Sequence, residues 1–517
     1  MKARSIVSLL ILALLVAVLG WLFLLRRPPA PRAPVVLPAS PELDCPRDPP
    51  APAVAPPSVP PDRVRWIFIG AVDSPSLNQV SIEQDGELLR SVLGENGLML
   101  SGGGPGARDV QVATRPGSRR DGGAFLQELA DLIAPRGGRD SRYRRSRLPL
   151  HGAARAVELE ATLRRVLRPA AAAGRSPLLL YIGGHGEQGA TARDAYVSLW
   201  GGRRLTARAL ATWLDEGSRP LALVVTSCFG GGFAETVFRG ADPERGIAVG
   251  RCGFFATTPD LPATGCDPNP DRQAQEGYAL RFFQALAGRD RDGKPLPRET
   301  LDLDGDGRVS LAEAHAHARV ALRSVDVPTT TSERWLRHVA PKSGPRRAVP
   351  LVEEHAVARA LARRTGLPEE LEAVRRALAA REAAAEQARQ RVEEGYAAED
   401  ETALDAIGEL LARWPVLDDP WHPDFPELLR CRRAAIEAHL RASPAYADYL
   451  EARDAVDSAE VKYWELRRRA APVERLARAL ENIVLAERLR ARGGPAWESY
   501  AALLACERTR LLSDERR

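Results

Sequence analysis

His185 and Cys228 stand in similar surroundings, each near the end of a short apolar run and each beside glycines. His185 follows LLLYI at residues 178–182 and two glycines, and Cys228 follows LALVV at residues 221–225, a threonine and a serine. A thiol is a weak nucleophile until it loses its proton, and a neighbouring imidazole can take that proton and later give it to a leaving amine. These residue types therefore predict a nucleophilic cysteine with a histidine as general base and acid, provided that the fold brings them together.

The two apolar runs predict neighbouring strands of a parallel sheet. A helix is expected between them at residues 206–215, and parallel strands joined by one helical crossover often pair directly. Both side chains would then leave the sheet at the carboxyl ends of adjacent strands, where open α/β sheets form their clefts. The backbone N–H groups of Gly186 and Cys228 are expected to bind the developing oxyanion there. A lone histidine or cysteine after a strand is more often structural, but the matching positions of these two favour catalysis.

Strand and helix patterns alternate from residue 63 to residue 345, which predicts an α/β domain with a mostly parallel sheet flanked by helices. Further strands are expected at residues 65–72, 111–113 and 253–257, and further helices at residues 83–93, 125–133, 154–167 and 277–286. Strand patterns stop near residue 346. Residues 346–517 are rich in Ala, Leu, Glu and Arg with helical periodicity, so an all-helical C-terminal module is expected, with Tyr446 and Tyr449 in its core.

The N-terminal residues carry a targeting pattern. A nearly unbroken apolar run at residues 6–25 has basic residues at both ends and is long enough to span a bilayer. No small-x-small site follows it, so residues 1–27 are interpreted as an uncleaved membrane anchor, with a cleaved signal peptide as the alternative. The proline-dense stretch 28–62 predicts an extended spacer, because proline fixes φ and removes backbone donors. We therefore expect a single-pass membrane protein with the bulk of the chain on the exported side, periplasmic or extracellular.

The pattern of an apolar strand with GGHG, followed by an apolar strand with SCFGGG, resembles the caspase-like (clan CD) cysteine peptidases. It is most similar to the bacterial legumain-like, C13-type proteins and to metacaspases, over roughly residues 63–345. The resemblance implies a cysteine endopeptidase that hydrolyses a protein or peptide substrate through a Cys228 thioester, without a cofactor in the chemistry. It also implies that His185 is the catalytic histidine and that the Gly186 N–H binds the oxyanion. Thr226 departs from arginine-specific relatives, which often carry an acid at that position.

Two aspartates are candidates for substrate binding. Caspases carry an arginine for substrate aspartate at the end of the first strand, and Asp73 stands there in this chain. An acid at that place would suit a basic P1 side chain, as in metacaspases, and Asp260, after the strand at 253–257, is expected to line the same pocket. The alternative is that both aspartates only cap loops. If P1 is basic, the arginine-rich loop 136–147 is a candidate self-cleavage site.

Residues 302–313 match the twelve-residue EF-hand loop, with carboxylates at positions 1, 3, 5 and 12 and glycine at position 6. The predicted Ca²⁺ ligands are Asp302, Asp304, Asp306, the main-chain carbonyl of Arg308, Ser310 through a water molecule, and Glu313. Four carboxylates in one loop repel one another unless a cation is present. A loop without a partner hand predicts a calcium site of modest affinity, structural or regulatory. The alternative is an acidic surface turn before a helix.

Charge and cysteine content narrow the remaining possibilities. The net charge of +5 over 517 residues is interleaved with acidic residues, which argues against a nucleic-acid partner. The chain contains no Cys-x-x-Cys pair of the kind that would indicate a zinc site. Cys252 and Cys266 are expected either to form a disulfide, if the domain is exported, or to stay reduced. The helical module could bind a protein partner. Two other functions remain: a catalytically silent, calcium-binding peptide sensor or scaffold, and a legumain-like transpeptidase that uses the same thioester.

Overall fold

The computed structural model describes residues 59–113, 123–133, 141–168, 177–419 and 422–511. Its centre is a sheet of six strands in the order β11-β10-β9-β5-β1-β2, in which only the edge strand β11 is antiparallel to its neighbour. The expected α/β fold with a mostly parallel sheet is confirmed. The strands are β1 (Trp66–Ala71), β2 (Gly97–Ser101), β5 (Leu178–Gly184), β9 (Leu221–Val225), β10 (Arg251–Phe255) and β11 (Thr329–Thr330).

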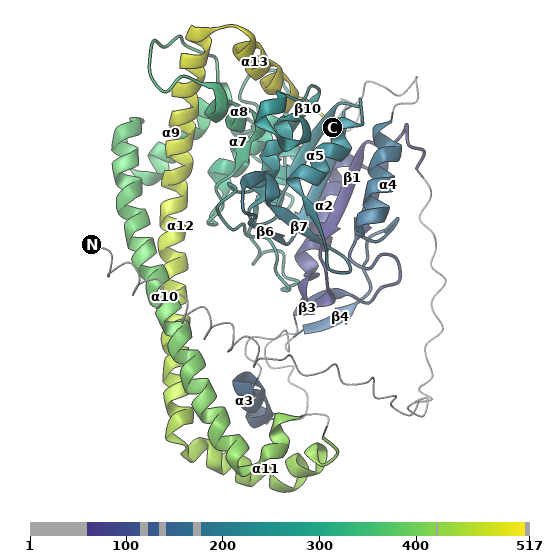
Figure 1. Cartoon of the computed structure of the whole chain (residues 1–517). Coiled ribbons are helices and arrows are strands. Elements are labelled where there is room, and N and C mark those ends of the chain that lie inside the picture. The colour runs from purple at the N-terminus through teal and green to yellow at the C-terminus, as the bar shows by residue number, and fades with distance from the viewer. Residues whose placement is uncertain (1–58, 114–122, 134–140, 169–176, 420–421, 512–517) are drawn as a thin grey trace, which may run out of the picture. The chain divides into compact units, whose positions relative to one another are not determined.

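Helices cover both faces of this sheet, which explains why its central strands are apolar at every position rather than at alternate ones (Figure 1). One face packs against α4 (Ala156–Leu167) and α5 (Ala207–Asp215). The other face packs against α2 (Val80–Leu93), α6 (Tyr278–Ala287) and α7 (Leu311–Ala321). Successive residues of a strand point to opposite faces, so Leu180 joins the first core and Tyr181 the second.

Two smaller sheets accompany the central one. β3 (Val110–Ala113) pairs with β4 (Ser141–Arg144), and β7 (Tyr196–Leu199) lies between β6 (Gly186–Glu187) and β8 (Arg203–Thr206). The strand predicted at 111–113 therefore exists but lies outside the main sheet. Part of the predicted arginine-rich loop is also a strand, and Arg144 in it forms an ion pair with the buried Glu83 at 2.6 Å. Residues 136–140 of that loop lie outside the described residues.

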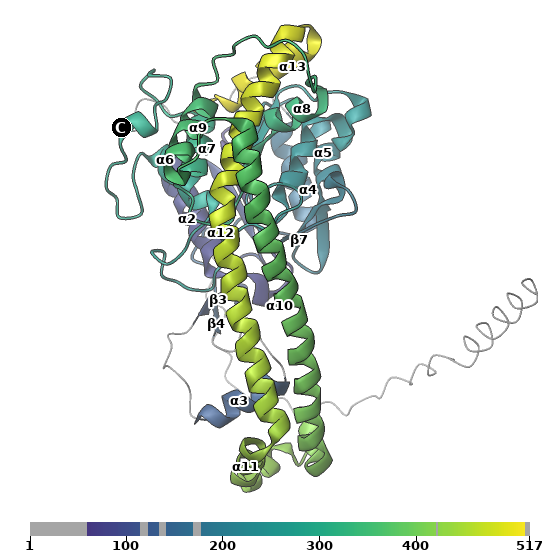
Figure 2. The same ribbon diagram turned by 90° about the vertical axis from the view of Figure 1, so that its left-hand side faces the viewer.

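The expected C-terminal helical region is confirmed. It contains α9 (Val352–Thr365), α10 (Leu371–Arg413), α11 (Phe425–Ala442), α12 (Pro444–Arg492) and α13 (Pro495–Glu507), and α8 (Thr331–Val339) precedes it. The long helices α10 and α12 run side by side in both views (Figures 1 and 2). Ser443 caps α12 by accepting a hydrogen bond from the N–H of Tyr446. Tyr446 and Tyr449 are buried as expected, in a cluster that also includes residues of α3 (Gly123–Ile133).

A disulfide joins the sheet to the last helix. Cys252 of β10 pairs with Cys506 of α13, with a Cα–Cα distance of 5.9 Å, whereas Cys266 is a free thiol. Neither of the two alternatives left open by the sequence holds in full: Cys252 does not pair with Cys266, and only Cys266 is reduced. Cys252 stands near the start of β10 with its side chain in the core, while Cys266 follows the opposite end of the same strand, so closeness in sequence does not bring the two together.

The predicted localisation as a single-pass membrane protein is contradicted. Among the residues that the structure describes, none of the helices combines the length and the apolar character needed to span a membrane. The apolar run at residues 6–25, the anchor predicted over residues 1–27 and nearly all of the proline-dense stretch 28–62 lie outside those residues.

Candidate active site at the carboxyl edge of the sheet

His185 and Cys228 leave the sheet at neighbouring positions, as the sequence predicted. Strands β5 and β9 pair in parallel, and the last registered partners are Ile182 and Val225. His185 and Cys228 each lie three residues beyond that pair. The N–H of Thr226 also donates to the carbonyl of Ile182 at 2.9 Å, so the two chains stay together past the strand ends.

Gly186 lies directly against Cys228. A Cβ atom added to Gly186 would stand 2.4 Å from the carbonyl oxygen of Cys228, so only glycine fits. The carbonyl of His185 accepts a hydrogen bond from the N–H of Ser198, which makes Gly186 and Val197 the non-hydrogen-bonded pair of the β6–β7 ladder. The N–H of Gly186 therefore points away from β7.

The imidazole of His185 is held by residues that follow β1. Its Nε2 lies 2.8 Å from Oε1 of Gln79, and the ring also hydrogen-bonds to the backbone of Leu77. Gln79 is itself fixed, because it is buried and its Nε2 donates to the carbonyl of Ser76 at 3.1 Å. Burial lowers the pKa of His185 below its ordinary value, although the Leu77 bond and the charge of Asp73 act in the opposite direction.

Cys228 sits in a sharp turn under a covering segment. Phe229, the next residue, has a φ of 56°, a strained conformation for a residue with a side chain. The Sγ of Cys228 donates to the carbonyl of Ala263 at 3.4 Å and accepts from its N–H at 3.3 Å. Burial raises the pKa of the Cys228 thiol, and the charges of Asp326 and Glu187 raise it further. Within the described part of the chain, the thiol and the imidazole are not hydrogen-bonded to each other, because each is engaged by another group.

A narrow pocket opens beside the two motifs, with Gly184 and Thr226 in its wall. Its charged residues are Asp85, Arg272 and Glu276. The carboxylate of Asp85 pairs with Nη2 of Arg272 and accepts from the hydroxyl of Tyr181 at 3.2 Å. Local patterns did not single out Asp85, because it is an acid on the buried side of an amphipathic helix and its partner lies far along the chain.

The two aspartates predicted to bind substrate lie apart from this pocket. Asp73 is half-buried and close enough to His185 to influence its pKa. Asp260 is exposed and lies within electrostatic range of Glu474 on α12. Neither residue lines the pocket that contains Asp85. Their role in substrate binding stays a prediction.

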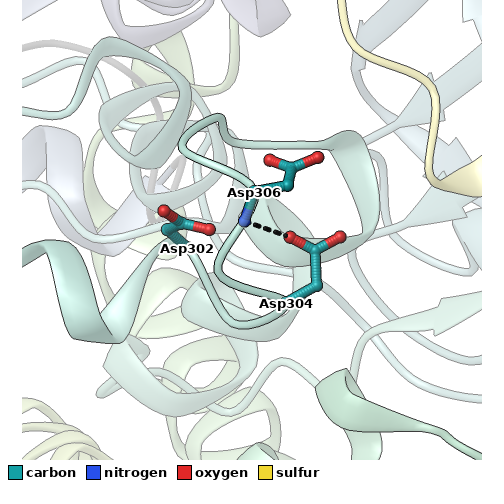
Figure 3. Close-up of side chains that lie close together, drawn as sticks. All are labelled: Asp302, Asp304 and Asp306. Carbon is teal, nitrogen blue, oxygen red and sulfur yellow. Dashed lines mark hydrogen bonds between the residues drawn. The ribbon is translucent and has the colours of Figure 1, made fainter.

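The acidic loop brings three of its predicted ligands together (Figure 3). Carboxylate oxygens of Asp302, Asp304 and Asp306 lie within 4.8 Å of one another, and the N–H of Asp306 donates to Oδ1 of Asp304. The Oδ1 atom of Asp302 is buried without a hydrogen-bond partner. An orphaned, buried carboxylate oxygen beside two further carboxylates fits a hard cation such as Ca²⁺.

Two other predicted ligands are occupied with each other. Ser310 and Glu313 form a capping box at the start of α7, in which each side chain bonds to the backbone of the other. The second carboxylate oxygen of Glu313 accepts from the N–H of Leu303 at 2.7 Å. Near the C-terminus, the guanidinium of Arg510 forms an ion pair with Asp306 and lies 3.7 Å from Asp304. A cation of the chain itself therefore stands beside the carboxylates.

The comparisons with known proteins add no assignment: no family model matches the chain, and neither does any curated protein.

Proposed function

We propose that this chain is a cysteine endopeptidase of the caspase-like type, with Cys228 as nucleophile and His185 as general base and acid. The observation that carries the proposal is the equivalent position of the two residues, each three residues past the last registered pair of β5 and β9. The glycines at 183, 184 and 186 and at 230–232 are buried and let the two motifs pack closely against neighbouring parts of the chain.

In this mechanism the thiol of Cys228 transfers its proton to His185, and Sγ attacks the carbonyl carbon of the substrate. The C–N bond breaks, the amine leaves with the proton from His185, and a thioester remains. Water then attacks the thioester, His185 takes a proton from it, and the C–S bond breaks to release the acid. The N–H of Gly186, which points away from β7 and lies beside Cys228, is placed to donate to the oxyanion in both steps.

A preference for a basic P1 side chain is part of the proposal. Asp73 stands near His185, and Asp85 lines the pocket that contains Gly184 and Thr226, so one acid lies near the proposed base and another in the neighbouring pocket. Asp260 is the third candidate, from the segment that follows β10. The present partner of Asp85 is an arginine, Arg272, which is the side-chain chemistry proposed for the substrate.

We further propose that the loop 302–313 binds Ca²⁺, held by Asp302, Asp304 and Asp306, with the Arg308 carbonyl, Ser310 and Glu313 completing the site if the capping box opens. Calcium would supply no step of the hydrolysis. It would neutralise the three carboxylates, replace Arg510 beside Asp306 and satisfy the buried Oδ1 of Asp302. Its effect is therefore expected on the stability of this part of the chain.

The engagement of both proposed catalytic groups by other residues favours one alternative, a catalytically silent sensor that binds peptide and calcium. The legumain-like transpeptidase stays an alternative with the same thioester, and the proposed protein partner of the helical region stays a prediction.

Hydrolysis of a fluorogenic peptide library with Arg, Lys, Asn or Asp at P1 distinguishes these functions. The full chain is assayed with calcium and with chelator, beside Cys228→Ala and the matched variant Cys431→Ala, which removes an exposed thiol. We expect turnover that Cys228→Ala abolishes and Cys431→Ala leaves unchanged, with Arg or Lys preferred. Absence of turnover on every substrate, with calcium binding intact, would favour the sensor. Ligated products in the presence of an added amine peptide would favour the transpeptidase.

A further inference from the structure

The segment 259–277, which connects β10 to α6, is called the strap below. It contains no helix or strand, although all of its residues are described. Connections longer than about 12–15 residues without secondary structure are uncommon in compact domains and are usually functional. This one crosses the carboxyl edge of the sheet in front of the proposed nucleophile.

The strap contacts Cys228 through its main chain. Both polar backbone groups of Ala263 bond to Sγ, the carbonyl as acceptor and the N–H as donor, at 3.4 and 3.3 Å. Two residues earlier, the carbonyl of Leu261 accepts from the N–H of Phe229 at 2.9 Å. The main chain of the strap therefore lies along the turn that presents Cys228 and is in contact with Sγ itself.

Beside Ala263, the strap is latched to a buried carboxylate. The N–H of Thr264 donates to Oδ1 of Asp326 at 2.7 Å, and its hydroxyl lies 2.9 Å from both carboxylate oxygens. Asp326 is fully buried in the connection between α7 and β11. Hydrogen bonds to a carboxylate are among the stronger ones in proteins, so this contact fixes the residue next to the one that holds the thiol.

Two further anchors attach the strap to α2. Ser81 and Asp267 bond reciprocally, since the N–H of Asp267 donates to Oγ of Ser81 at 2.7 Å and the N–H of Ser81 donates to the carbonyl of Asp267 at 3.2 Å. Nine residues after Ala263, Arg272 forms an ion pair with Asp85 in the pocket beside the motifs. The strap therefore covers Cys228 with its main chain. It also places Arg272 against Asp85 in the neighbouring pocket.

We propose that the strap is an intramolecular inhibitor that slows reaction at Cys228, because the thiol is accessible only while the contact between Thr264 and Asp326 is open. This inference rests on the proposed role of Cys228 as the nucleophile. Substrate and strap compete for the same thiol and the same pocket, so activity requires displacement of the Ala263 main chain from Sγ. Burial raises the pKa of the Cys228 thiol, although the hydrogen bond from Ala263 acts in the opposite direction, so the inhibition rests on the contact that covers Sγ.

The test is the rate at which iodoacetamide alkylates Cys228 in the full chain, followed by peptide mass spectrometry. This rate reports how accessible the thiol is and does not depend on peptidase activity. The exposed thiol of Cys431 is the internal reference. Thr264→Val removes the hydroxyl from the latch, and Ser81→Ala weakens a different anchor. The control is Thr212→Val, whose hydroxyl bonds only to a carbonyl of its own exposed helix turn.

We expect the alkylation rate of Cys228, relative to that of Cys431, to rise about tenfold in Thr264→Val, the size of one lost hydrogen bond to a charged group, and to stay unchanged in Thr212→Val. A rise in Ser81→Ala supports the same conclusion. If alkylation and peptide hydrolysis both rise, the strap inhibits a peptidase. If alkylation rises without any hydrolysis, the result supports the covering of Cys228 by the strap and contradicts the proposed peptidase function. Equal rates for the wild type, Thr264→Val and Ser81→Ala, all as fast as at Cys431, would overturn the proposal.

Discussion

The Nε2 atom of His185 lies 2.8 Å from Oε1 of Gln79, a residue 106 positions earlier in the chain. Because the amide nitrogen of Gln79 is tied to the carbonyl of Ser76, its oxygen faces the ring as an acceptor. An acceptor at Nε2 favours a ring that carries a proton there. Gln79 is therefore a positioning residue for the proposed base, which it orients without touching the substrate.

Replacement of Gln79 tests this role through the pH profile. Gln79→Glu places a negative charge beside the imidazole, which raises the pKa of His185, so the acid limb of kcat/KM is expected to move to higher pH. Gln79→Ala is expected to lower kcat about tenfold, with little change in KM, because the ring loses its orientation. A purely structural role would reduce the amount of folded protein without moving the limb. The matched control is Gln387→Glu, at an exposed position of α10.

The sequence predicted the pair because its determinants are local. Five consecutive apolar residues before each motif specify a strand buried on both faces, and the glycines mark the turns at the strand ends. The partners of these groups are not local. Ala263 lies 35 residues from Cys228, and Asp326 lies 62 residues from Thr264. Neither periodicity nor motif spacing carries such information, so the strap, Gln79 and Asp85 were visible only in the fold.

The calcium loop also combines local contacts that the sequence predicted with a distant contact that it did not. The ligand pattern predicted that Asp302, Asp304 and Asp306 would converge, and they do. The pattern did not predict the contact with Arg510, which lies among the last described residues of the chain. The disulfide between Cys252 and Cys506 joins residues 254 positions apart, and proximity in sequence offered only Cys266 as a possible partner of Cys252.

Calcium is expected to stabilise the chain in competition with Arg510. At about one hundred times its Kd, a ligand that binds only the folded state stabilises it by about 2.7 kcal/mol, which would raise Tm by a few degrees in differential scanning fluorimetry. Asp302→Asn should abolish the rise. Arg510→Ala should lower the Kd for calcium in titration calorimetry, because it removes the competing cation.

Asp292→Asn is the control for this experiment, because that aspartate belongs to another acidic turn and faces Lys294. A calcium response that Asp302→Asn leaves intact would place the ion elsewhere. A Kd that Arg510→Ala leaves unchanged would show that the guanidinium does not compete.

Loss of the disulfide is expected to destabilise the chain strongly. A cross-link that closes a loop of this length is worth about 5 kcal/mol in the chain-entropy account. Cys506→Ser should therefore lower the midpoint of urea unfolding, and a reducing agent should do the same to the wild type. Cys431→Ser, at an exposed free cysteine, is the control and should behave as the wild type. Equal midpoints for the wild type under oxidising and reducing conditions would contradict the prediction.

Glu507, the neighbour of Cys506, carries a buried carboxyl group at the start of α8. It accepts hydrogen bonds from the hydroxyl of Thr331 at 2.9 Å and from the N–H and hydroxyl of Ser332 at 2.8 and 2.6 Å. Burial outweighs these bonds and raises the pKa of Glu507 from 4.5 to about 7. Burial also raises the pKa of Asp326, from 3.8 to about 6, so the two acids act on stability in the same direction.

Because the folded chain holds the Glu507 proton more tightly than the unfolded chain, this residue contributes stability that is complete below about pH 4.5 and is lost as the pH rises through about 7. The loss amounts to about 3 kcal/mol, since one pKa unit corresponds to about 1.4 kcal/mol. The Gln side chain cannot ionise, so Glu507→Gln should unfold in urea with a free energy that falls less between pH 5 and pH 8 than that of the wild type. Glu498→Gln, at an exposed position of the same helix, should keep the wild-type slope. Parallel pH profiles for the wild type and Glu507→Gln would show that the carboxyl ionises at its ordinary pKa in the folded chain.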